Sequence, residues 1–153
     1  MPVDIQTMLV ATDFSNASAP AYAFSLARAL NARLYVIYVV PEDDVRMITA
    51  ISRHLQSEVT PAALVETFYA EADKRLATLV QDVCATDLVP ERLIVTGQPA
   101  TAIISWAAAK QVQLIIIGTH GRHGVTRFMM GSVAERVLRE APCAVLVVPA
   151  TPQ

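Results

Sequence analysis

Apolar and polar positions follow two periods along this chain, and the two periods alternate from one end to the other. Short apolar runs bounded by polar or turn residues predict buried strands. These strands are expected at residues 7–12, 33–40, 92–96, 113–118 and 144–148. The runs LIIIG and AVLVV in the last two strands are apolar at every position, which is typical of strands covered on both faces in a parallel sheet.

Segments in which apolar residues recur every three or four positions separate the strands and predict helices. The first helix begins at Ser15 or Ser18 and tolerates Pro20 in its first turn. Its buried face is expected to consist of Ala23, Leu26, Ala27 and Leu30. Two later helices are expected, one after the turn at 97–99 and one at about 132–141.

The middle of the chain has the weakest pattern. Apolar positions between Val45 and Leu55 indicate a short helix. Thr60 and Pro61 match an N-cap followed by proline at the first helical position, which predicts a long helix to about Ala85. Because strands and helices alternate without a visible linker or repeat, we expect one domain over residues 1–153. Its fold class is α/β, with a parallel sheet between two layers of helices.

Composition and charge indicate where the protein is located and what it binds, and they say less about its fold. Apolar residues make up 54% of the chain, yet no apolar run approaches the roughly 18 residues that cross a bilayer. The N-terminus lacks the features of a signal peptide, so a cytoplasmic location without membrane contact is expected. The net charge of −2 gives no general attraction to nucleic acid. Cys84 and Cys143 adjoin apolar positions and are expected to be core thiols.

Four of the five glycines lie in one stretch, GTHGRHGVTRFMMGSV, at residues 118–133. The stretch follows the fourth predicted strand and ends where a helix begins, at the rim of the sheet where α/β folds bind ligands. Glycines allow left-handed backbone or close approach to a ligand. N–H groups at a helix N-terminus favour a phosphate, and Arg122 and Arg127 add positive charge. A capping box of Ser132 and Glu135 is the alternative, and it needs no ligand.

The spacing Gly118-x2-Gly121-x9-Gly131-Ser132 resembles the nucleotide-binding signature of the universal stress protein family. ATDFS at 11–15 and SVAERVLREAPCAVLVVP at 132–149 are similar to the start and the end of these proteins. The resemblance covers nearly the whole chain. It implies the adenine nucleotide-binding α/β fold, a three-layer sandwich whose five-stranded parallel sheet has the order 3-2-1-4-5, with helices on both faces.

The resemblance also implies a nucleotide site whose members have separate roles. Asp13 would bind the ribose hydroxyls, and the backbone of Val39 would bind the adenine edge. Ala11 and Ile117 would line the adenine, and the backbone of Gly118 would contact the ribose. The phosphate contacts would come from Gly121, Gly131, Ser132 and Val133, with positive charge from Arg122.

Several of these residues also have an explanation that needs no ligand. Asp13 suits an Asx turn before the first helix, and Val39 and Ile117 would be core residues in any fold of this class. His120 and His123 lie two residues apart, but no third ligand stands at a usual spacing, so no metal site is expected.

The expected function is that of a regulatory stress-response protein that binds ATP, ADP or AMP, with Mg²⁺, between the end of the first strand and the glycine loop. The alternatives are a nucleotide-independent interaction protein and a weak ATPase. No catalytic residue is assigned, because no phosphate-loop lysine motif or acid–base pair is visible. Besides an unidentified regulatory protein, the expected partner is a second copy of the chain. It would pair through the uncharged edge strand Ala144, Val145, Leu146, Val147 and Val148.

Overall fold

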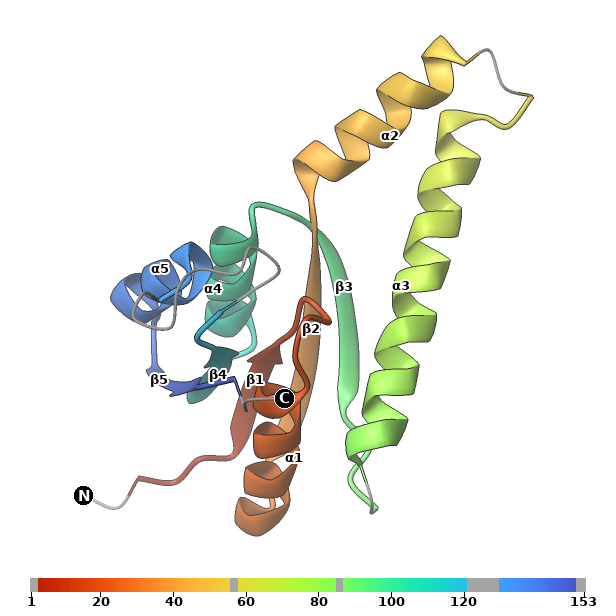
Figure 1. The fold of residues 1–153 in the computed structure, drawn as a ribbon. Helices are drawn as coiled ribbons and strands as arrows, with labels where there is room; N and C mark the ends of the chain where they lie inside the picture. The colour runs from red at the N-terminus through yellow and green to blue at the C-terminus, as the bar shows by residue number, and fades with distance from the viewer. Residues whose placement is uncertain (1–2, 56–57, 85–86, 121–129, 151–153) are drawn as a thin grey trace.

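A parallel sheet lies at the centre of the computed structural model, which describes residues 3–55, 58–84, 87–120 and 130–150 (Figure 1). Its strands are β1 (Thr7–Ala11), β2 (Arg33–Pro41), β3 (Glu91–Gly97), β4 (Leu114–Gly118) and β5 (Ala144–Val148). The helices are α1 (Ser18–Leu30), α2 (Glu42–His54), α3 (Pro61–Val83), α4 (Pro99–Ala109) and α5 (Ser132–Glu140). The strand order is β3-β2-β1-β4-β5 and every pair is parallel, which confirms the predicted sheet.

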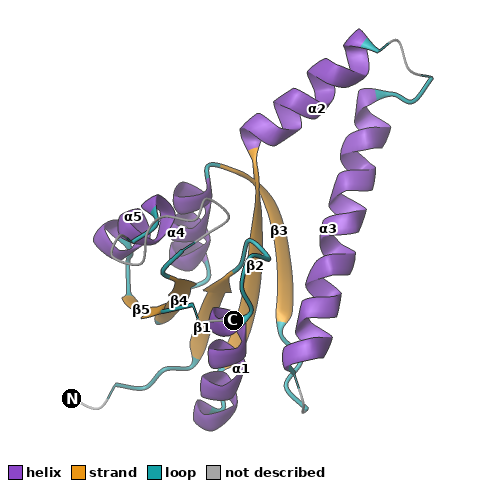
Figure 2. Cartoon of the chain, in the orientation of Figure 1, coloured by secondary structure: helices purple, strands orange, loops and turns teal. Residues whose placement is uncertain are grey.

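Helices cover both faces of the sheet, because successive strand residues point to opposite sides (Figure 2). In β1, Met8 and Val10 belong to a buried cluster that includes residues of α1 and α3. Leu9 between them belongs to a second cluster, formed with residues of α4 and α5. The three-layer arrangement expected from the sequence is therefore confirmed.

The last two strands differ in burial, although their sequences are equally apolar. In β4, the side chains from Leu114 to Ile117 are buried. In β5, Ala144 is exposed, the next three residues are half-buried and Val148 alone is buried. The expectation that both strands are covered on both faces is wrong for β5, because this strand is an edge of the sheet.

The helices α2 and α3 form a hairpin that extends beyond the sheet (Figure 1). The short helix expected at Val45 to Leu55 is present as α2, which begins three residues earlier. Thr60 caps α3 as predicted, since its Oγ1 accepts a hydrogen bond from the N–H of Ala63 at 3.2 Å. The hairpin lies on the same face of the sheet as α1. Val45 of α2 packs there against the buried cluster that includes residues of α1 and α3.

The first helix begins at Ser18, one of the two predicted positions, but its cap and its buried face differ from the prediction. Neither predicted serine caps it: Ala17 is the N-cap, and the Asn16 side chain accepts a hydrogen bond from the N–H of Ser18 at 2.7 Å. The predicted face is partly wrong, because Leu30 is 43% exposed and Phe24 is buried instead. A helix packed beside another helix and a sheet buries a wider stripe than one heptad pattern marks.

No helix in the described part of the chain is long and apolar enough to span a membrane. Cys84 and Cys143 are half-buried, and each packs against one of the two buried clusters. Burial raises the pKa of the Cys143 thiol, and a hydrogen bond with the backbone of Ile115 partly offsets this rise.

Candidate functional site

A cavity of about 500 Å³ opens among the described residues at the carboxyl ends of β1, β2 and β4. Its position follows from topology, because β1 leads into α1 on one face of the sheet whereas β4 leads toward α5 on the other. Neighbouring strands whose connections diverge leave a crevice in which α/β proteins bind ligands. The volume lies within the usual range for small-molecule sites, about 300–1,000 Å³.

The cavity brings together eight of the ten predicted site residues. These residues are Ala11, Asp13, Val39, Ile117, Gly118, Gly131, Ser132 and Val133. The other two, Gly121 and Arg122, lie outside the described residues. Contact of any of the ten with a nucleotide stays a prediction.

The ends of β2 and β4 give the cavity an apolar wall. Val39 and Ile117 are only 7% and 6% exposed, and both belong to the buried cluster of α4 and α5. They are therefore core residues, as the explanation without a ligand requires, and they line the cavity as well. A flat apolar group entering between them would complete the burial of this wall.

Asp13 follows β1 in a turn that its own side chain helps to form. Its Oδ1 accepts hydrogen bonds from the backbone N–H of Ser15, at 2.9 Å, and from the Ser15 hydroxyl. The Asx turn considered from the sequence is therefore present. Asp13 is half-buried and lines the cavity, so the same turn holds a carboxylate in the cavity wall.

The N-terminus of α5 forms another wall of the cavity. Gly131 is the N-cap, and its N–H donates a hydrogen bond to the carbonyl of Thr119 at 2.7 Å. The capping box considered as the alternative is absent, because Ser132 is the first helical residue and no side-chain hydrogen bond caps the helix among the described residues. Glu135 instead has its Oε1 3.7 Å from Nη2 of Arg139. The first turn of α5 therefore presents N–H groups that no described side chain caps.

The charged groups around the cavity determine which groups could bind an anion there. Asp13 and Glu135 are acidic, and no lysine or arginine stands among the described lining residues. A phosphate in this part of the cavity would be bound by N–H groups and hydroxyls. Repulsion from Glu135 is weakened by its pairing with Arg139 and by exposure to water. Arg122, expected to contribute positive charge, lies outside the described residues.

Left-handed backbone does not explain why the described positions are glycine. No described glycine has a positive φ, and Gly131 has a φ of −61°. A Cβ added to Gly118 would lie 3.7 Å from the carbonyl oxygen of His120, an ordinary contact. Of the two explanations for the glycines, left-handed backbone does not apply to Gly118 or Gly131, and close approach of a ligand stays open. Gly121 and Gly124 lie outside the described residues.

Sequence reasoning missed several cavity residues, including Thr12, Tyr38 and Thr119, and gave no cavity role to His120. Nδ1 of His120 lies 3.0 Å from Oγ1 of Thr119, and its Nε2 is buried without a partner among the described residues. All four residues lie at or next to the carboxyl end of a strand, and this position in the sequence could have identified them as cavity residues. Within the described chain, no three His, Cys, Asp or Glu side chains come together as metal ligands. His123 lies outside it.

Comparison with known proteins identifies the family. A model described as the universal stress protein family matches residues 4–149. Universal stress protein MJ0531 of Methanocaldococcus jannaschii is 34% identical over 143 residues, covering 92% of this chain and 80% of the relative. The structure of universal stress protein UspA from Lactobacillus plantarum is 25% identical with a TM-score of 0.73, covering 96% of this chain and 99% of that one. A universal stress protein solved in complex with cAMP is 27% identical with a TM-score of 0.60, covering 97% of this chain and 100% of that one. The chain belongs to the universal stress protein family.

Proposed function

We propose that the chain binds an adenine nucleotide, ATP, ADP or AMP, in the cavity between β1 and β4, and acts as a regulatory protein. The observation that carries the proposal is the make-up of that cavity. A buried apolar wall, a carboxylate and a helix N-terminus that no described side chain caps line one space of about 500 Å³. These three surfaces suit a base, a ribose and a phosphate. The related protein solved with cAMP supports the same ligand class.

The proposal assigns each part of the nucleotide to a segment of the chain. The adenine lies beside Ala11, Val39 and Ile117, where apolar contact and backbone groups at the strand ends bind it. A carboxylate accepts hydrogen bonds from two hydroxyls at once, so Asp13 binds the ribose. The backbone of Gly118 approaches the ribose from β4.

Backbone N–H groups of Gly131, Ser132 and Val133, together with the Ser132 hydroxyl, bind the phosphates at the start of α5. The helix dipole favours negative charge there. Gly121 and Arg122 complete the phosphate site, and Mg²⁺ accompanies a triphosphate. Repulsion by Glu135 makes the affinity for ATP modest.

A second copy of the chain is the partner that we propose for β5. This strand is an edge of the sheet and its middle residues are half-buried, so its backbone N–H and C=O groups can recruit another strand. Antiparallel pairing about a twofold axis makes the contact closed. Val148 also lines the cavity, and its carbonyl accepts a hydrogen bond from Thr119 at 3.0 Å. The nucleotide and the dimer edge thus share one strand, through which binding can alter assembly or partner contacts.

Mass spectrometry of nucleotide released from protein purified without added ligand tests the proposal. Co-purified ATP, ADP or AMP at a substantial molar fraction is the expected result. Recovery of a different ligand class would overturn it. A nucleotide-free protein that also fails to bind added ATP would favour the nucleotide-independent alternative. Release of ADP and phosphate during incubation with ATP would instead identify the weak ATPase.

A further inference from the structure

We infer that Phe14, held between Tyr38 and Arg75, is a positioning residue that aims the Asp13 carboxylate at the nucleotide. The inference rests on the function proposed above. Asp13 and Ser15 line the cavity, whereas Phe14 between them is not a lining residue and packs against the buried cluster of α1 and α3. The middle residue of this turn is therefore an anchor for the two residues that face the ligand.

The backbone of Phe14 is in a conformation that bulky residues rarely adopt. Its φ of 66° lies in the left-handed region. Its N–H donates to Oγ1 of Thr12 at 3.1 Å, and the chain reversal brings the N–H of Ser15 to 2.9 Å from Oδ1 of Asp13. Strained backbone of this kind persists only where surrounding contacts enforce it. The contacts of Phe14 therefore determine where the Asp13 carboxylate lies.

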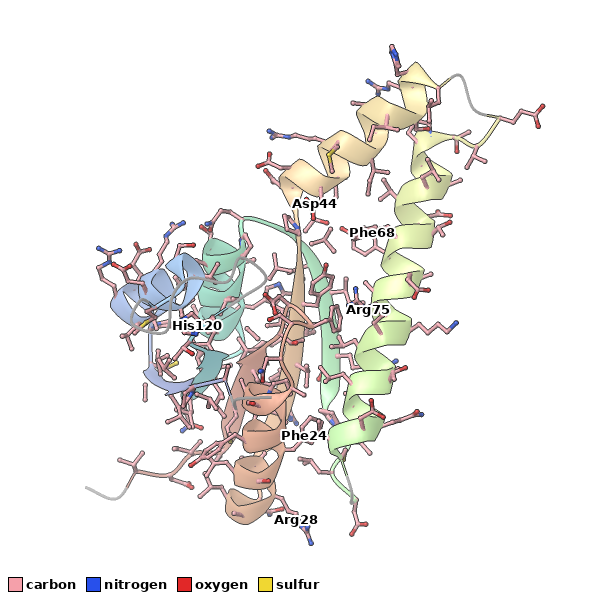
Figure 3. All side chains as sticks on the ribbon, in the orientation of Figure 1. Phe24, Arg28, Asp44, Phe68, Arg75 and His120 are labelled. Atoms are coloured by element: carbon pink, nitrogen blue, oxygen red, sulfur yellow. The ribbon has the colours of Figure 1, made fainter. Side chains whose placement is uncertain are left out.

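Two side chains from other elements supply these contacts. The ring centroids of Phe14 and Tyr38 are 4.6 Å apart and the rings are tilted by 48°, within the favourable range for aromatic pairs. Cζ of Arg75 lies 4.3 Å from the centroid of the Phe14 ring, a cation–π contact. Figure 3 shows Arg75 on the side of α3 that faces the sheet. Phe14 is thus fixed from β2 and from α3 at once.

This arrangement lets α3 act on the ribose without touching the nucleotide. If the guanidinium is removed, the Phe14 ring loses its cation–π contact with α3 and the Asx turn loosens. Asp13 then offers its carboxylate to the ribose hydroxyls less often. Contacts to the base and the phosphates are unaffected, because they come from β2, β4 and α5.

The test compares ATP with 2′,3′-dideoxy-ATP, which lacks the hydroxyls that Asp13 would bind. Calorimetric affinities are measured for wild type, Arg75→Gln and Arg75→Lys. Lys74→Gln is the matched control, because it removes the same charge from an exposed neighbour on α3. We expect Arg75→Gln to weaken ATP about two- to fivefold, the size of one partly exposed cation–π contact, and to leave dideoxy-ATP unchanged. Arg75→Lys retains a cation and restores part of the loss, and Lys74→Gln changes neither affinity.

Equal weakening of both nucleotides by Arg75→Gln, or no weakening of either, would overturn the inference. Amide hydrogen exchange at Ser15, measured without nucleotide, separates the inference from the proposed function. Its N–H is bonded to Asp13, so Arg75→Gln should speed its exchange and Lys74→Gln should not. Faster exchange in a chain that binds no ATP would show that the turn is clamped and that the nucleotide assignment is the error. Unchanged exchange would show that Arg75 does not position Asp13.

Discussion

Asp13 is the residue whose chemistry distinguishes parts of the ligand. If it binds the ribose, Asp13→Ala should weaken ATP, ADP and AMP by similar factors, equivalent to about 1–3 kcal/mol for lost hydrogen bonds to a charged group. Calorimetry with the three nucleotides measures this. Asp13→Asn is the control for the turn, because an amide oxygen still accepts from the N–H of Ser15. Loss of ATP affinity with AMP unaffected would place Asp13 near the metal or the terminal phosphates instead.

At the residue scale, the sequence predicted which side chains meet but not how they are held. The resemblance to the family pointed to Asp13 and Ser132, and both line the cavity. The left-handed backbone of Phe14 and its contact with Arg75 depend on tertiary packing across 61 positions, which no local pattern reports. The capping box is absent because helix α5 begins at Ser132, one residue earlier than the box requires, so that Gly131 takes the N-cap position.

Helix α3 depends on its cap more than on its interior threonines. Thr60→Ala should lower the free energy of unfolding by about 1 kcal/mol, because the N–H of Ala63 loses its side-chain acceptor. Urea denaturation measures the change. Thr67→Ala is the matched control, since its hydroxyl only bonds back to the carbonyl of Ala63 within the helix. Alanine favours helix there, so this variant should be neutral or slightly more stable. Equal losses in the two variants would contradict the cap.

At the element scale, strand and helix identities followed from the periodicity, because apolar runs and helical spacing differ in period. The exposure of β5 did not follow, since a run such as AVLVV has the same pattern in a central strand and at an edge. The order of the strands in the sheet decides whether such a strand is central or at an edge, and this order is a property of the whole chain. The extent of α2 was also underestimated, because only Ser52 is buried among its residues and the apolar pattern is correspondingly weak.

At the scale of the whole molecule, pairing of two copies through β5 predicts a particle of twice the 16.5 kDa chain mass. Light scattering at micromolar concentration measures this. Val147→Lys places a charge in the middle of the half-buried edge and should shift the protein toward monomer. Met47→Lys is the control, because it puts the same charge on α2 at a residue already 57% exposed. A monomeric wild type, or a lysine variant at position 147 that still dimerises fully, would rule out this interface.

Nucleotide binding in the cavity between β1 and β4 is the central claim, and calorimetric titration of ATP into wild type and Gly131→Val tests it most directly. Gly131 lies in the cavity wall at the start of α5, where we expect a phosphate to approach the backbone. Gly97→Ala is the control for loss of a glycine, because its new Cβ would make an ordinary 3.7 Å contact with Ala102 outside the cavity. The account predicts one ATP per wild-type chain, retained binding in Gly97→Ala, and no binding by a Gly131→Val protein whose circular dichroism is unchanged. ATP affinity in Gly131→Val equal to that of wild type would contradict it.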